Sequence, residues 1–155
     1  MTKTLLFLHL LSAFLLVGGA TAAGVAQIAA LRRERPGEIA MLLRLTRPGV
    51  ALVNVGALGT LAFGIGLAEQ EDIGLGTGWV SAALALWVVM MLLGGLGGRS
   101  ARHARRLAER LAAECDTPNE ELRSLVAHRP SLLLSYASTA AIVAILVLMV
   151  WRPGA

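Results

Sequence analysis

The sequence predicts an all-α integral membrane protein, a four-helix bundle whose main helices each cross the bilayer. Hydrophobic residues make up 56% of the 155 residues, and charged residues only 15%. The mean hydropathy of +0.69 is higher than a soluble domain of this length needs to fill a core. Crossing about 30 Å of hydrocarbon takes roughly 20 helical residues. Four stretches without charged residues meet that length, namely residues 4–31, 48–68, 75–98 and 130–151.

Arginine is distributed unevenly between the connections. Five arginines lie between the first two stretches and seven in residues 99–129, whereas residues 69–72 carry no basic side chain. Because basic residues accumulate in cytoplasmic loops, we expect both arginine-rich loops in the cytoplasm and both termini outside. The same distribution explains the pI of about 10.6 without a nucleic-acid partner. Residues 1–155 then form one membrane domain with one long cytoplasmic loop.

The first stretch also has features of a secretory signal peptide. Lys3 precedes an apolar run, and Ala20–Thr21–Ala22 fits a small-residue cleavage site. The uncharged run continues to Leu31, however, and residues 32–35 then add three arginines. A signal peptide has a core of only about 7–15 apolar residues. We therefore predict that the first stretch stays in the protein as a membrane span.

The segment between the first two spans is expected to be a short amphipathic helix. Pro36–Gly37 interrupts the preceding helix, since proline removes a backbone donor. Residues 38–46 then place their apolar side chains on one side, which suits a position at the lipid headgroups. Pro48 is expected to begin span 2, because proline is favoured in the first helical turn.

The long loop is expected to hold two further short helices. Residues 99–115 form a basic amphipathic pattern, which favours contact with anionic lipid headgroups. Thr117–Pro118–Asn119–Glu120 resembles a capping box with Thr117 as the N-cap, and predicts a helix to about Ala127. Cys115 is the single cysteine, so the chain cannot form an intramolecular disulfide.

His9 is the histidine that lies inside a predicted span. Ionisable residues within a membrane often mark a functional site, and Met149 is expected at a similar depth near the outer surface, in span 4. Imidazole and thioether groups bind haem iron and copper, so His9 and Met149 are the candidate ligands of a haem or a copper ion. The alternative is that His9 bonds to a neighbouring polar group and Met149 fills the core.

Polar residues also define one face on each of two spans. His9, Ser12 and Gln27 share a side of span 1 at about 100° per residue, and Ser135 and Ser138 share a side of span 4. Asn54 is the polar residue of span 2 that we expect to form a hydrogen bond between helices. These faces are predicted to turn toward the interior of the bundle. The spans contain no charged side chain, which argues against a proton-coupled pump.

Two short motifs resemble a family of small bacterial predicted integral membrane proteins of unknown function. The first is Leu8–Phe14 followed by Val17–Gly19, and the second is the closing motif Leu148–Gly154. The family itself looks distantly similar to the copper-resistance D-type and HemJ-type four-helix membrane proteins. That resemblance implies a bacterial inner-membrane location and a haem-linked role for His9. The chain has no intramembrane lysine, in which it departs from the HemJ-type pattern.

Taken together, these patterns favour a small structural or accessory membrane component over an enzyme. The chain lacks a phosphate-binding loop, a dinucleotide fingerprint and a clustered metal-ligand motif. Two alternatives stay open: a haem- or copper-binding redox protein that uses His9, and a passive solute pathway through an oligomer. The expected partners are membrane lipid and either further copies of the chain or another membrane protein.

Overall fold

The computed structural model describes residues 2–74 and 76–152, and within these ranges the chain is helical without strands. The five helices are α1 (Thr2–Leu31), α2 (Pro36–Gln70), α3 (Gly78–Glu114), α4 (Glu120–Val126) and α5 (Arg129–Trp151). Helices α1, α2, α3 and the segment that ends with α5 are long and apolar enough to cross a membrane. The predicted all-α, four-span architecture is therefore confirmed. Residue 75, where the third predicted span begins, lies outside the described residues.

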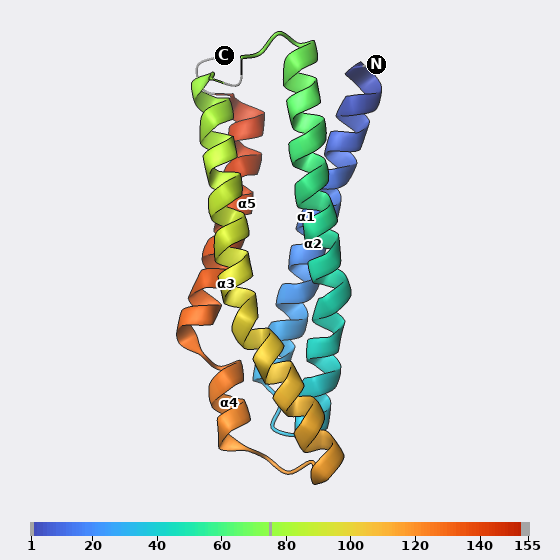
Figure 1. The fold of residues 1–155 in the computed structure, drawn as a ribbon, viewed down its shortest axis with the longest axis vertical. Coiled ribbons are helices and arrows are strands. Elements are labelled where there is room, and N and C mark those ends of the chain that lie inside the picture. Colours follow the sequence, from blue (N-terminus) through green and yellow to red (C-terminus); the bar gives the residue numbers. More distant parts are fainter. Residues whose placement is uncertain (1, 75, 153–155) are drawn as a thin grey trace.

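The long helices form two antiparallel pairs. Helix α1 packs against α2, and α3 packs against α5, while α2 and α3 hold the two pairs together. The start of α1 and the end of α5 lie at the same end of the bundle, and the short α4 lies beside α3 at the other (Figure 1). Each pair is thus a helical hairpin, and the bundle is two hairpins side by side.

Glycine brings the helices of the first hairpin unusually close. A Cβ atom on Gly19 would lie 2.6 Å from the Gly49 carbonyl oxygen, and one on Gly56 would lie 2.6 Å from the Ser12 carbonyl oxygen. Real Cβ atoms do not approach other atoms this closely, so a larger residue would push the helices apart. We call this contact, made by Ser12, Leu16 and Gly19 of α1 with Gly49, Gly56 and Gly59 of α2, the α1–α2 seam. Small residues allow such approach in lipid, where close packing drives helix association.

The helices of the second hairpin also approach closely at glycine, here opposite serine side chains. A Cβ on Gly94 of α3 would lie 3.1 Å from the Ser138 hydroxyl, and one on Gly97 would lie 2.8 Å from the Ser135 hydroxyl. Ser138 Oγ also donates a hydrogen bond of 3.0 Å to the Met90 carbonyl of the other helix. Glycine on α3 therefore makes room for the polar face of α5.

The two hairpins meet in a small apolar core at the middle of the bundle. Its buried residues come from all four long helices: Leu16, Ala57, Met90, Ala141 and Ile142. The Trp87 indole Nε1 donates a hydrogen bond of 3.0 Å to the Ala57 carbonyl, which joins α3 to α2 at the same level. This core and its hydrogen bond connect the two hairpins at the middle of the bundle.

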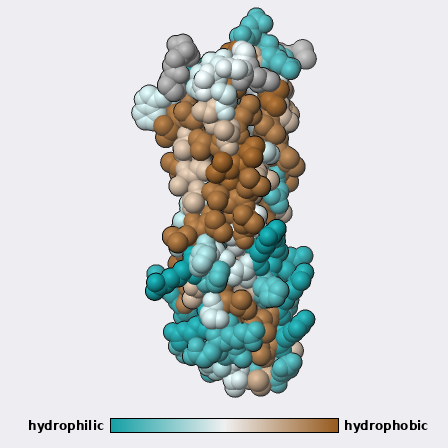
Figure 2. Space-filling model, turned by 60° about the vertical axis from the view of Figure 1, so that its left-hand side comes forward, coloured by the Kyte–Doolittle hydropathy of each residue, from teal (hydrophilic) through white to brown (hydrophobic). Residues whose placement is uncertain are grey.

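At the end opposite the chain termini the helices continue into a polar region. We call residues 26–47 and 99–129 the polar cap; Figure 2 shows it as the hydrophilic end below the apolar band. Pro48 lies inside α2, and α3 runs without a break through residues 94–98 to Glu114. The expected separate amphipathic helices are therefore extensions of the spans. Two residues before Pro48, the Thr46 hydroxyl donates a 2.7 Å hydrogen bond to the Leu43 carbonyl of the same helix.

The polar cap has its own hydrophobic core. Eight buried residues of α1, α2, α3 and α4 form it: Ala30, Ile39, Ala40, Leu43, Ala104, Ala108, Leu122 and Val126. Gly19 of α1 lies against Gly49 of α2, which comes just after Pro48. The turns of α1 that follow Gly19 therefore run into the cap. The first apolar stretch is long because its first part serves as a span and its last turns fill the cap core.

Two capping contacts fix the ends of the cap helices. Asn119 is the N-cap of α4, and its side-chain oxygen accepts a 3.0 Å hydrogen bond from the Leu122 amide. The predicted N-cap, Thr117, is therefore wrong by two residues, because the extended backbone of Asn119 aims its own carboxamide at the helix. Asp116, in the loop before α4, accepts a 2.6 Å hydrogen bond from the Gly37 amide and thus caps α2.

Candidate functional site

His9 lies in the first hairpin, at the level of Gly64. A Cβ on Gly64 would lie 3.1 Å from the imidazole Cε1 and 3.3 Å from Nδ1, so the ring rests against α2 where glycine leaves room for it. Its Nδ1 atom is buried and, among the described residues, has no hydrogen-bond partner. The polar face of α1 is thus directed at α2, whereas the sequence predicted the centre of the bundle.

The surroundings of His9 do not form a complete haem or copper site. Met149 lies half-buried on α5, whose main packing partner is α3, while His9 belongs to the pair of α1 with α2. Among the described residues, no three or more His, Cys, Asp or Glu side chains group closely enough to hold a metal ion. A haem would also need room beside the ring, which packs directly onto the α2 backbone at Gly64. The residues present therefore do not fit the group that the resemblance implied, although the free Nδ1 atom is a coordinating atom.

The other predicted polar residues have separate positions. Ser12 is buried in the α1–α2 seam, and its hydroxyl donates 2.7 Å to the Leu8 carbonyl of its own helix. Ser135 donates 3.0 Å to the Ser131 carbonyl, and Ser138 bonds to α3 as described above. The donor hydrogens of these three serines are therefore used within the hairpins, and only their acceptor lone pairs are left for a ligand.

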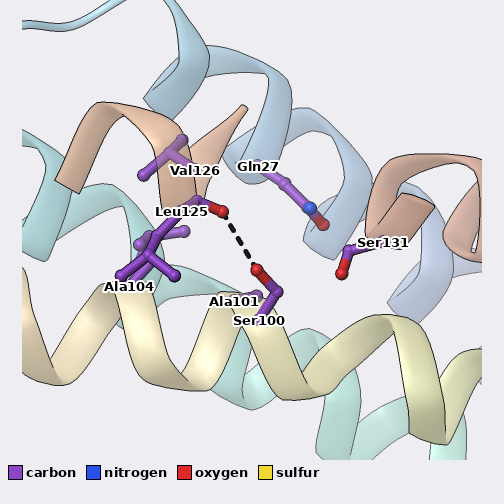
Figure 3. A pocket seen from close by; sticks show the side chains of 8 residues that line it. Gln27, Ser100, Ala101, Ala104, Leu125, Val126 and Ser131 are labelled. Carbon is purple, nitrogen blue, oxygen red and sulfur yellow. Dashed lines mark hydrogen bonds between the residues drawn. The ribbon is translucent and has the colours of Figure 1, made fainter. Parts of the chain in front are cut away.

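Gln27 lines a small cavity in the polar cap, with a volume of about 10 Å³. In Figure 3 the side chains of Gln27, Ser100 and Ser131 point toward the same space, and Ser100 Oγ donates 3.0 Å to the Leu125 carbonyl. The volume is close to what one water molecule requires. The cavity therefore suits a bridging water and is too small for an organic substrate. It joins α1, α3 and α5 where the cap meets the spans.

Asn54 lies on the exposed side of α2. Gly56 faces α1. Asn54 comes two positions earlier, which corresponds to a rotation of about 200° around the helix axis, so Asn54 points away from the α1–α2 seam. Among the described residues its side chain makes no hydrogen bond. The expected bond to a neighbouring helix of the same chain is therefore not formed within the described residues.

A larger groove lies between α2 and α3 in the polar cap, with a volume of about 340 Å³. Ala40, Met41, Leu45 and Ala112 form its apolar walls. Arg44 Nε donates a 2.9 Å hydrogen bond to Glu109 across it, and this bond lowers the pKa of the Glu109 carboxyl, with smaller contributions from the charges of Arg44 and nearby arginines. The groove thus has apolar walls and one ion pair, Arg44 with Glu109, across it.

Sequence patterns did not predict this groove, the cap core or the capping of α2 by Asp116. The partners in each contact are far apart in the chain, 65 residues for Arg44 with Glu109 and 79 for Gly37 with Asp116. One signal was present, because Asp116 and Asn119 are typical capping residues. The sequence alone does not indicate which helix Asp116 or Asn119 caps, because that depends on how the loop before α4 packs against α2.

Comparison with known proteins gives one match. The family model described as predicted integral membrane protein (DUF2269) matches residues 3–153. No curated protein and no solved structure matches the chain, so the resemblance to copper-resistance D-type and HemJ-type proteins stays a prediction. A match over nearly the whole length, together with four helices long enough to cross a membrane, is decisive: the chain belongs to this family of integral membrane proteins, whose function is unknown.

Proposed function

We propose that this protein is a small, non-enzymatic accessory component of the bacterial inner membrane that holds a rigid basic cap at the cytoplasmic face. The observation that carries the proposal is the continuity of α2 and α3, which pass from the apolar band into the cap without a break. A span and a cap that share the same helices move together. The bundle therefore serves to fix the height and orientation of the cap.

The polar groups of the spans support a packing role for the bundle. Most described hydroxyls there bond to a backbone carbonyl of the same hairpin; examples are Ser12, Thr21, Thr60, Ser135, Ser138 and Thr139. A solute pathway needs a line of free polar groups, and an active site needs several that converge. The two cavities described above are lined by cap residues and by Ser131 at the start of α5, which supports a ligand-accessible space in or next to the cap.

The basic cap fits a location beside the cytoplasmic leaflet, where anionic lipids attract arginine. It also offers the 340 Å³ groove with its apolar walls, a shape suited to an apolar side chain or short helix of a partner protein. Positive charge around an apolar groove would favour a partner with acidic flanks.

Site-specific photocrosslinking in cells tests this function. A photoreactive amino acid at Met41, 68% exposed in the groove, is expected to give one discrete protein adduct, whereas the same group at Phe14, 75% exposed on α1, is expected to give lipid adducts. Equal protein adducts at both positions, or none at Met41, would contradict the proposal.

The haem alternative, which the packing of His9 onto α2 at Gly64 does not favour, is tested by the absorbance spectrum of the purified protein. Haem binding predicts a Soret band in the purified protein that disappears in His9→Ala and persists in Ser12→Ala, a nearby change in the same face. The accessory function predicts a colourless protein without bound metal in both cases. A third arm, solute flux into liposomes, tests the passive pathway, for which the accessory function predicts no increase over empty vesicles.

A further inference from the structure

Asn54 is a polar side chain that faces away from its own protein in the apolar part of α2. It lies six residues after Pro48, or about 9 Å farther along the helix. The residue is exposed, and its carboxamide has two donor hydrogens and an acceptor oxygen. Hydrocarbon offers none of these groups a partner, so the exposed position is unfavourable unless another protein covers it.

Other exposed polar residues of the spans do not have this problem. Thr21 donates a 2.9 Å hydrogen bond to the Val17 carbonyl, and Thr139 donates 3.1 Å to the Ser135 carbonyl, each within its own helix. A hydroxyl that is bonded to the preceding turn can face lipid. The exposed carboxamide of Asn54 has no such bond among the described residues, and it therefore indicates a missing partner.

The side of α2 around Asn54 has the spacing of a helix-pairing surface. Ala51, Val55 and Ala62 are exposed, and Leu58 is 60% exposed. Stepping along this side by alternating three and four residues gives a series of apolar positions interrupted by one polar residue: Ala51, Asn54 and Leu58, which are exposed, and Leu61 and Ile65, which are half-buried. A repeat of about 3.5 residues is typical of two helices that wrap around each other with a left-handed twist. Helices α1 and α3 pack on other sides of α2, at Gly56 and Ala57.

The geometry points to a second copy of this chain as the occupant, with α2 paired to α2 and Asn54 bonded to Asn54. All copies of a membrane protein have the same orientation, so a two-fold axis between two of them lies along the membrane normal. The two α2 helices are then parallel, and both Asn54 residues have the same depth. A carboxamide is self-complementary, since each can donate to and accept from the other. The pairing does not depend on whether the cap has a partner.

The charged residue on this side of α2 is compatible with the pairing. Arg47 is one heptad before Asn54 and exposed, just before Pro48 at the edge of the apolar band. Guanidinium groups there reach the lipid headgroups and water, where salt screens their repulsion. The carboxamides, by contrast, lie in hydrocarbon, where the hydrogen bonds between them are retained.

Dimerisation measured in liposomes of phospholipid, by energy transfer between labelled copies at several protein-to-lipid ratios, tests the inference. Hydrogen bonds between membrane helices contribute about 0.6–2 kcal/mol, so Asn54→Leu is expected to raise the dimer dissociation constant about 3- to 30-fold. Asn54→Gln, which keeps the carboxamide, is expected to retain most of the affinity. Thr21→Val, a control for an exposed hydroxyl, is expected to change it less than twofold. A monomeric wild type, or an Asn54→Leu variant that pairs as well as the wild type, would overturn the inference.

Disulfide formation in native membranes locates the interface independently. In a Cys115→Ser background, Leu58→Cys is expected to give a covalent dimer on mild oxidation, because residue 58 lies one turn from Asn54 on the same side. Phe14→Cys, at a position on α1 that is also exposed (75%, against 60% for Leu58), is expected to stay monomeric. Similar cross-linking of both variants would show random collision in the membrane, and cross-linking of Phe14→Cys alone would assign the interface to α1; either result contradicts pairing through α2.

Discussion

Replacing Gly56 by alanine is expected to destabilise the first hairpin through a steric effect that can be separated from helix propensity. A Cβ at this position would lie 2.6 Å from the Ser12 carbonyl oxygen and 2.8 Å from Leu16 Cα. Both are backbone atoms, which cannot rotate away. Ordinary contacts begin near 3.4 Å, so the two helices must separate by up to roughly 1 Å, and overpacking of this kind costs about 1–3 kcal/mol.

Gly18→Ala is the matched control for this change. A Cβ on Gly18 would meet nothing within 4 Å, and both substitutions replace a helical glycine by alanine, which gains about 0.5–1 kcal/mol of helix propensity. The propensity cancels in the comparison. The difference in unfolding free energy between the two variants is therefore expected to be about 1–3 kcal/mol, with Gly56→Ala the less stable.

Unfolding in mixed micelles at increasing sodium dodecyl sulfate, followed by tryptophan fluorescence, measures this difference. Trp79 and Trp87 are both on α3, and Trp87 bonds to Ala57 next to the substituted position, so its emission reports on the same region. If the two variants unfold at the same detergent fraction, the close packing of α1 on α2 is not a source of stability and the reasoning fails.

Three further predictions concern single polar contacts. Asp116→Ala removes the cap of α2 and is expected to destabilise the protein by about 1 kcal/mol, with Asp116→Asn closer to the wild type in the same unfolding assay. Ser138→Ala removes the bond between α3 and α5 and is expected to cost about 0.6–1.7 kcal/mol, more than Thr139→Ala, whose hydroxyl bonds within α5; equal losses would contradict this. Because Arg44 lowers the pKa of Glu109 in the folded protein, the stabilisation is present above the usual glutamate range and is lost as the pH falls through it and below. Acidification across that interval should therefore lower the unfolding midpoint of the wild type more than that of Glu109→Gln.

The number and type of the spans could be predicted because the bilayer imposes one length on every crossing. Uncharged stretches of roughly 20 residues identify such crossings whatever packs against them. The boundaries were harder, since Pro48 was expected to begin a helix and instead lies inside α2. A proline at the polar edge of a span can be accommodated because neighbouring side chains and water satisfy the backbone that it leaves free.

The direction of each polar face could not be predicted from one helix alone. Helical periodicity placed His9 and Ser12 on one side of α1, and the structure brings that side against Gly64 and Gly59 of α2. Periodicity says which residues share a side, but the identity of the helix opposite depends on the glycines that permit close approach. The same reasoning explains Asn54, for which the sequence indicated the need for a partner without indicating that α1 and α3 would pack elsewhere.

The cap core contains residues from helices that are synthesised at different times, which has a consequence for how the protein is assembled. The α1–α2 hairpin is complete once Gln70 has been made, whereas the cap core also requires Leu122 and Val126. At about 5–20 residues per second, the interval is on the order of 3–11 s. During this time Ala30, Ile39 and Leu43 have no α3 or α4 to cover them, and the nearest apolar surface is the membrane itself. The segment around residues 38–46 would then rest on the lipid surface during biogenesis, as its amphipathic pattern suggests, and leave it when the rest of the cap arrives.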